Sequence, residues 1–106
     1  MERKMTVTRQ PTAREIGTVF AARVREEPIA RELWITSERD GVHLWLIIDP
    51  IEDDDAELSL YGLLTVLDEP FPEADFQLHV LNPLTYTSDP RESLPAHAEP
   101  IPLRAA

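Results

Sequence analysis

Residues 42–49, Val-His-Leu-Trp-Leu-Ile-Ile-Asp, constrain the fold more than any other stretch, because an extended strand of this sequence is apolar on both faces. Successive side chains of a strand point to opposite faces. One face carries Val42, Leu44, Leu46 and Ile48, and the other carries His43, Trp45 and Ile47. Such a strand is typical of a central position in a sheet that is covered on both sides.

The residues before this strand predict an antiparallel neighbour for it. Residues 32–36 alternate in the way of a half-buried strand, and the five-residue stretch Ser37–Gly41 has the composition of a turn. Gly41 stands where a turn favours a positive φ angle. The segment 32–49 is therefore predicted to be a β-hairpin.

Two helices are predicted from capping signals and apolar spacing. The first, over 12–27, begins with the capping-box pattern Thr12-Ala-Arg-Glu15. The second, over 54–68, begins with Asp54-Asp-Ala-Glu57, which has the same pattern. In each helix, apolar residues recur every three or four positions, and a proline follows the helix.

Residues 75–81 form the third predicted strand, which the second helix joins to 42–49, so these two strands are expected to be parallel. The expected fold class is α+β: a small three-stranded mixed sheet with two helices. A proline-rich tail over 82–106 is expected to pack on it. With 106 residues, the chain is expected to be a single domain, residues 1–106, with residues 1–11 as a flexible arm or an edge segment.

The charge of the chain argues against nucleic acid as a direct ligand. The net charge is -10; residues 1–39 hold eight basic and six acidic residues, whereas residues 40–106 hold two basic and fourteen acidic ones. Phosphate backbones are bound by cations that replace counterions, so this surface repels them. Solubility, a basic protein partner or mimicry of nucleic acid would each explain the acidity. No stretch has the length and apolarity of a membrane span or a secretory signal, which predicts a cytoplasmic protein.

Four segments together resemble a minimal nucleotidyltransferase domain, the small kind found as an antitoxin beside HEPN toxins. They are Leu33–Ser37 (LWITS), Val42–Asp49 (VHLWLIID), Phe76–Leu81 (FQLHVL) and Ala98–Arg104 (AEPIPLR). The resemblance implies that the first three are the strands of that family and that the last is its closing segment.

The motifs that carry the chemistry of that family are missing from this chain. In that family, a Gly-Ser turn holds the nucleotide phosphates. Separate carboxylates hold the divalent metal. Ser37 has no glycine before it, and the Asp-x-Asp positions fall on Gly41 and His43. The position of the third-strand carboxylate falls near Gln77 or His79. The resemblance therefore implies a degenerate member, more a non-enzyme than an enzyme, and no cofactor is predicted.

Trp34, Trp45 and His43 are the predicted interface residues, because they lie on the hairpin face opposite Leu33 and Leu44. Exposed tryptophan is typical of interface anchors. The alternative is that helices cover both faces and bury these side chains. His43 and His79 are expected on the same sheet face, where packed or half-exposed positions are more common than a zinc pair.

Asp53, Asp54 and Asp55 are the predicted metal-binding residues, within the densest group of acids in the chain. Carboxylates bind hard divalent cations. The alternative interpretation is the capped start of a helix on a solvated loop, since acidic side chains stabilise the positive end of a helix.

These patterns predict a non-catalytic protein-interaction or regulatory domain whose partner is another protein or a second copy. The resemblance implies a degenerate nucleotidyltransferase-like fold and an antitoxin-like role for it. One alternative is a divergent metal-dependent nucleotidyltransferase or nucleotide binder that uses Asp53–Asp55. The other is an acidic mimic of nucleic acid.

Overall fold

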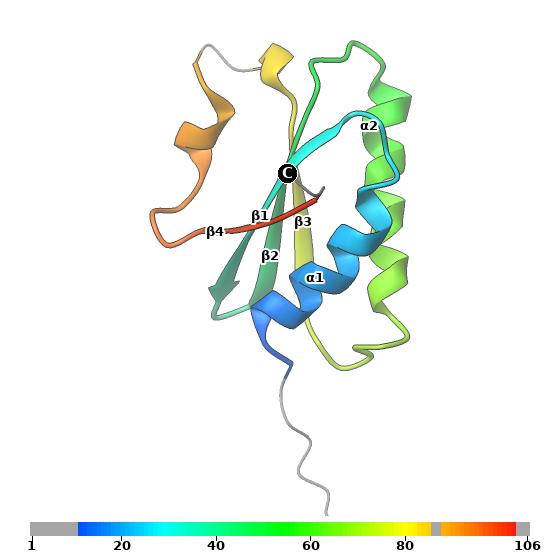
Figure 1. The fold of residues 1–106 in the computed structure, drawn as a ribbon, viewed down its shortest axis with the longest axis vertical. Helices are drawn as coiled ribbons and strands as arrows, with labels where there is room; N and C mark the ends of the chain where they lie inside the picture. The colour runs from blue at the N-terminus through cyan, green and yellow to red at the C-terminus, as the bar shows by residue number, and fades with distance from the viewer. Residues whose placement is uncertain (1–10, 86–87, 104–106) are drawn as a thin grey trace, which may run out of the picture.

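The computed structural model of the chain describes residues 11–85 and 88–103. It is an α+β fold in which two α-helices and short 3-10 helices accompany one four-stranded sheet (Figure 1). The elements are α1 (Ala13–Val24), β1 (Ala30–Glu38), β2 (Gly41–Ile48), α2 (Asp54–Tyr61), η1 (Gly62–Leu67), β3 (Phe76–Leu81), η2 (Pro83–Thr85), η3 (Pro90–Ser93) and β4 (Glu99–Ile101). The arm predicted over 1–11 lies outside the described residues except for Pro11.

The sheet has the strand order β3-β2-β1-β4, so β2 is an interior strand as its sequence predicts. The antiparallel pairing of β1 with β2 and the parallel pairing of β2 with β3 are confirmed. The prediction of three strands is wrong by one, because β4 pairs antiparallel with β1. β4 has only three residues and contains Pro100, which lacks an N–H and fits an edge strand. Such a short, proline-containing segment carries no alternation from which a strand could be predicted.

The turn of the hairpin is shorter than predicted. Glu38 pairs with Gly41, so only Arg39 and Asp40 lie between the paired ends of β1 and β2. Gly41 has a φ angle of 123°, as expected for a glycine in a hairpin turn. Its Cα also lies so close to β3 that an added Cβ would stand 2.2 Å from the carbonyl oxygen of Asp75. Glycine is therefore required here both by the backbone angle and by the neighbouring chain.

Helix α1 starts as predicted, whereas the second helix departs from prediction in two ways. The capping box of α1 is present, with Thr12 and Glu15 exchanging hydrogen bonds of 3.0 Å. The cap of α2 is Asp53, not Asp54, and Glu57 instead accepts a hydrogen bond from Asn82. The predicted continuous helix over 54–68 changes to the 3-10 form at Gly62, a residue with weak α-helical propensity.

Both α-helices and η1 pack on one face of the sheet, where the main hydrophobic core lies (Figure 1). Phe20 of α1 is fully buried in this core, as are Leu44 and Leu46 of β2. The second face carries Trp34, Thr36, His43, Trp45, Gln77 and His79, and we call it the open face. Among the described residues no α-helix covers it, although the segment 88–98 contacts part of it through Arg91 and His97. Ile47 and Leu81 are buried on this side, apart from the main core.

The described part of the chain contains no helix with both the length and the apolar content that crossing a bilayer requires.

Candidate functional site

Three aromatic rings meet at the centre of the open face. β2 supplies His43 and Trp45, and β3 supplies His79, which lies beside Trp45 in the parallel register. The rings of Trp45 and His79 are stacked with centroids 4.0 Å apart and an angle of 14° between their planes. The rings of His43 and His79 are stacked at 5.0 Å. We call His43, Trp45 and His79 the His–Trp cluster; all three side chains are half-buried.

A chain of hydrogen bonds runs from the hairpin turn into this cluster. Nε2 of His43 lies 2.8 Å from Oδ1 of Asp40, and Nδ1 of His43 lies 2.8 Å from Nε2 of His79. An ionised carboxylate only accepts, so His43 donates to Asp40 through Nε2. A neutral His43 then accepts at Nδ1 from the N–H of His79. The second oxygen of Asp40 accepts from Gln77, at 2.9 Å.

A second polar chain fixes the orientation of Trp45. Its indole N–H donates to the hydroxyl of Thr36 across the hairpin, at 3.1 Å. The Thr36 hydroxyl is hydrogen-bonded to the carboxylate of Glu38, which also contacts His97 at 3.0 Å. These contacts hold the pKa of Glu38 below its ordinary value. Thr36 is almost fully buried, so the indole N–H of Trp45 is hydrogen-bonded to a fixed partner, while the ring itself is half-buried.

Trp34 is hydrogen-bonded to Glu32, a carboxylate that also takes part in a long-range ion pair. Its indole N–H donates to Glu32, at 3.0 Å. Arg91, from the segment after β3, forms hydrogen bonds and an ion pair with the same carboxylate. The guanidinium of Arg91 is the main cause that lowers the pKa of Glu32. The segment around η3 is thereby attached to β1 beside Trp34.

The electrostatics of the cluster favour neutral imidazole at His79. Partial burial is the largest cause that lowers the pKa of His79, and the neighbouring His43 is the second. Asp40 acts in the opposite direction but is a smaller cause. The pKa of Asp40 itself is lowered, chiefly by its hydrogen bond with His43. The nearness of the two imidazoles therefore disfavours a positive charge on His79.

Protonation of His79 is expected to destabilise the fold below neutral pH. Because the folded pKa lies below the ordinary value of 6.5, the unfolded chain binds more protons between these two pH values. The stabilisation is fully present above the unfolded pKa and is lost as the pH falls through the folded one. We expect the urea midpoint of the wild type to fall between about pH 7.5 and about pH 5.5, and less so for His79→Gln.

The carboxyl groups of the site affect stability in a lower pH range than His79 does. The folded pKa values of Glu32, Glu38 and Asp40 lie below ordinary values of 4.5, 4.5 and 3.8. Their stabilisation is present above those values and is lost only at lower pH. If the wild type and His79→Gln lose the same stability between about pH 7.5 and about pH 5.5, protonation of His79 is not the cause of the loss.

The chemistry available to the His–Trp cluster is the holding and transfer of a proton. Asp40 and His79 contact opposite nitrogens of the His43 ring, so these three groups do not converge on one metal ion. Within residues 11–85 and 88–103, no three His, Cys, Asp or Glu side chains are placed to hold a metal. The resemblance expects metal carboxylates at Gly41, at His43 and near Gln77 or His79. Of these residues, His43 and His79 contact each other.

Asp53, Asp54 and Asp55 lie together at the start of α2, away from the His–Trp cluster. Asp53 uses its carboxylate to accept from the backbone N–H groups of Asp55 and Ala56, at 2.9 and 3.2 Å. All three aspartates are exposed. Their arrangement is that of a helix cap with acidic residues in the first turn, the alternative that the sequence also allows.

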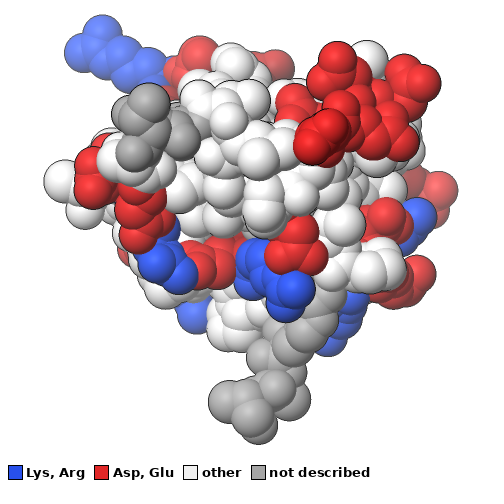
Figure 2. Space-filling model, turned by 90° about the horizontal axis from the view of Figure 1, so that it is seen from above, with Lys and Arg blue, Asp and Glu red and all other residues white. Residues whose placement is uncertain are grey.

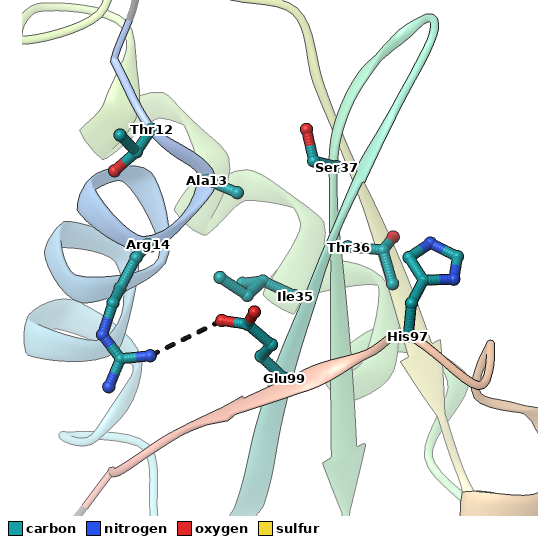
Figure 3. Close-up of a pocket in the computed structure, with 8 residues that line it drawn as sticks. All are labelled: Thr12, Ala13, Arg14, Ile35, Thr36, Ser37, His97 and Glu99. Atoms are coloured by element: carbon teal, nitrogen blue, oxygen red, sulfur yellow. Dashed lines mark ion pairs between the residues drawn. The ribbon is translucent and has the colours of Figure 1, made fainter.

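A separate pocket of about 390 Å³ lies between the start of α1 and the edge of β1 (Figure 3). Ile35 forms part of its wall, and Arg14 and Glu99 form an ion pair of 3.7 Å across its side. Ser37 and His97 also line it. The His–Trp cluster is not part of this pocket. Thr36 is the link between them, because it lines the pocket and also accepts a hydrogen bond from Trp45.

The structure brings together part of what the sequence predicts. The predicted interface residues Trp34, Trp45 and His43 lie on one face, and His43 and His79 share that face as expected. Sequence reasoning missed Asp40 and Arg91. The sequence pattern indicates only a turn at Asp40, and no pattern in the sequence indicates that Arg91 reaches Glu32 across 59 residues.

Comparison with known proteins places no further constraint on this site: no protein-family model, curated protein or solved structure matches the chain.

Proposed function

We propose that this chain is a non-catalytic protein-interaction domain that binds another protein chain through its open face. The observation that carries the proposal is the set of half-buried aromatic side chains on a sheet face with no α-helix over it in the described residues. Tryptophan and histidine rings provide large contact areas at low cost in conformational entropy. The partner is a second copy of the chain or a different protein.

Rigidity of the face supports this proposal. The indole of Trp45 is tied to Thr36 and stacked on His79, and the indole of Trp34 is tied to Glu32. Side chains that are already ordered lose little entropy when a partner binds. The face is therefore preorganised for contact, because these hydrogen bonds are formed within the chain itself.

The charges on the face are also paired within the chain. Asp40 contacts His43 and Gln77, while Glu32 contacts Arg91. A partner that covers these groups does not have to neutralise isolated charges, which are expensive to desolvate. This pairing suits a partner surface that is largely uncharged, including the same face of a second copy.

The predicted resemblance to degenerate nucleotidyltransferase domains is part of the proposal. In it, Gly41, His43 and either Gln77 or His79 stand in the places of metal carboxylates. The function proposed on this basis is an antitoxin-like role in the cytoplasm. The metal-dependent alternative has less support, since Asp53 is engaged in capping α2.

A photo-crosslinking experiment tests the open face. A benzoylphenylalanine placed at Trp34 is expected to form a covalent adduct in host cells with one discrete protein or with a second copy. The same residue placed at Thr18, which is exposed on α1, is the matched control. Discrete adducts from position 34 alone support the proposal. An identical set of adducts from both positions, or none from position 34, would overturn it.

A further inference from the structure

The outer side of α2 exposes two large apolar side chains that no described element covers. Leu58 is 63% exposed and Tyr61 is 38% exposed, whereas Leu60 between them is 2% exposed and belongs to the core. Residues three apart are neighbours on a helix surface, so Leu58 and Tyr61 form one contact area. Exposed apolar residues that adjoin each other indicate a binding surface more strongly than isolated ones.

Acidic side chains adjoin this contact area. Asp54 precedes Leu58 by four residues and Asp55 precedes it by three, so both lie on the same side of the helix as Leu58. Both carboxylates are exposed. Figure 2 shows acidic side chains gathered over one corner of the molecule, where α2 begins.

The stretch of sequence that contains α2 is uniformly acidic. Between Asp40 and Pro90 the sequence has twelve acidic residues and no lysine or arginine. This stretch includes all of α2, η1 and β3. The exposed pair Leu58 and Tyr61 therefore lies in a stretch of the chain that has acidic residues and no lysine or arginine.

We propose that this α2 surface, formed by Asp54, Asp55, Leu58 and Tyr61, binds a basic amphipathic segment of a partner protein. Apolar side chains of the partner cover Leu58 and Tyr61, while its lysine or arginine side chains lie beside the two aspartates. Helical segments with an apolar stripe and a basic flank fit such a surface. α2 lies on the other side of the sheet from the open face, so this inference is independent of the proposed function.

Charge complementarity selects this occupant over the others. A second copy would place the same acidic residues against each other, and like charges in an interface disfavour association. Nucleic acid and anionic lipid headgroups are repelled for the same reason. A basic partner gains both apolar burial and electrostatic attraction, and the attraction also raises its rate of association.

The test uses the full chain and a fluorescent peptide designed as a helix with leucine on one face and lysine on the other. A peptide with serine in place of leucine is the control for charge alone. By fluorescence anisotropy, we expect Leu58→Ser/Tyr61→Ser to weaken binding of the lysine–leucine peptide by at least about tenfold. Binding of the lysine–serine peptide stays unchanged, because it does not use the apolar pair. Leu58→Met/Tyr61→Phe keeps the wild-type affinity.

The electrostatic part is tested by a second pair of variants. Asp54→Asn/Asp55→Asn is expected to weaken binding of the lysine–leucine peptide several-fold at low salt and to reduce its salt dependence. Glu26→Gln/Glu92→Gln removes two exposed carboxylates from other parts of the chain and leaves the affinity close to that of the wild type. Asp53 is left intact because it caps α2.

Three outcomes would overturn the inference. One is an affinity for the lysine–leucine peptide that Leu58→Ser/Tyr61→Ser does not change. Another is that Asp54→Asn/Asp55→Asn and Glu26→Gln/Glu92→Gln weaken peptide binding equally, which would indicate attraction to net charge alone. The third is self-association, or binding to duplex DNA or anionic vesicles, that Leu58→Ser/Tyr61→Ser abolishes, since a different occupant would then use the surface. Because Leu58 and Tyr61 are exposed, unchanged thermal unfolding of the variant checks that the fold is intact.

Discussion

Gly41→Ala is expected to lower the free energy of unfolding by about 4 kcal/mol, because two separate costs add. The first is the φ angle of 123°, which side chains with a Cβ rarely adopt. The second is steric: the new Cβ would stand 2.2 Å from the carbonyl oxygen of Asp75, a backbone atom that accepts from the N–H of Val42 at 2.9 Å. Relief of the clash must separate the start of β2 from β3.

Chemical denaturation followed by tryptophan fluorescence measures this loss. Gly62→Ala is the matched control, because a Cβ at Gly62 meets no atom within 4 Å and its φ angle is −67°. We expect the control to be neutral or to gain about 0.5 kcal/mol from reduced freedom of the unfolded chain. A loss below about 1 kcal/mol for Gly41→Ala would contradict the described geometry of the hairpin turn.

Gly41→Ala is also expected to disturb the His–Trp cluster. Gly41, the first residue of β2, follows Asp40 directly, and the carboxylate of Asp40 contacts His43 at 2.8 Å. A shift of the turn by even one ångström would break that contact, since hydrogen bonds weaken steeply with distance and angle. In NMR spectra, we therefore expect the imidazole signals of His43 to move in the variant and those of His97 to move less.

Phe20→Ala is the second prediction with a large effect, an expected loss of about 3–5 kcal/mol. Phe20 is fully buried between α1 and the sheet and belongs to the main core. Its removal leaves a cavity that the surrounding strands can fill only in part. A small domain has a total stability of about 5–15 kcal/mol, so this one substitution removes a large share of it.

Thr18→Ala on the exposed side of the same helix is the control for Phe20→Ala. Its expected effect lies within about 0.5 kcal/mol of zero, because the side chain is exposed and replacement by alanine suits a helix. Thermal unfolding by circular dichroism compares the two variants under the same conditions. Similar midpoints for both would mean that α1 does not pack through Phe20.

The sequence predicts the scaffold of the candidate site but not its contacts. Alternation along 42–49 predicts an interior strand, and capping and spacing predict α1, because these signals act within a few residues. The same alternation places His43 and Trp45 together and away from Leu44. The contact of His43 with His79 needs the parallel register of β2 and β3, which no local pattern encodes.

Other parts of the site depend on segments that are far apart in the chain. Arg91 contacts Glu32 and thereby attaches the segment around η3 beside Trp34. β4 pairs with β1 although its three residues contain a proline. Such contacts follow from how the completed sheet and its core position the tail, so they have no signature in the tail itself.

By itself, the sequence determined the α+β class, the hairpin with its glycine, the interior position of the strand over 42–49 and the net negative charge of residues 40–106. Each of these depends on side-chain alternation, backbone angles or charge, which are properties of neighbouring residues. Only the tertiary structure decided which face of the sheet the helices cover. Packing of α1, α2 and η1 on one side buries Leu44 and leaves the ring of Trp45 half-exposed, because two helices suffice to cover one sheet face and not both.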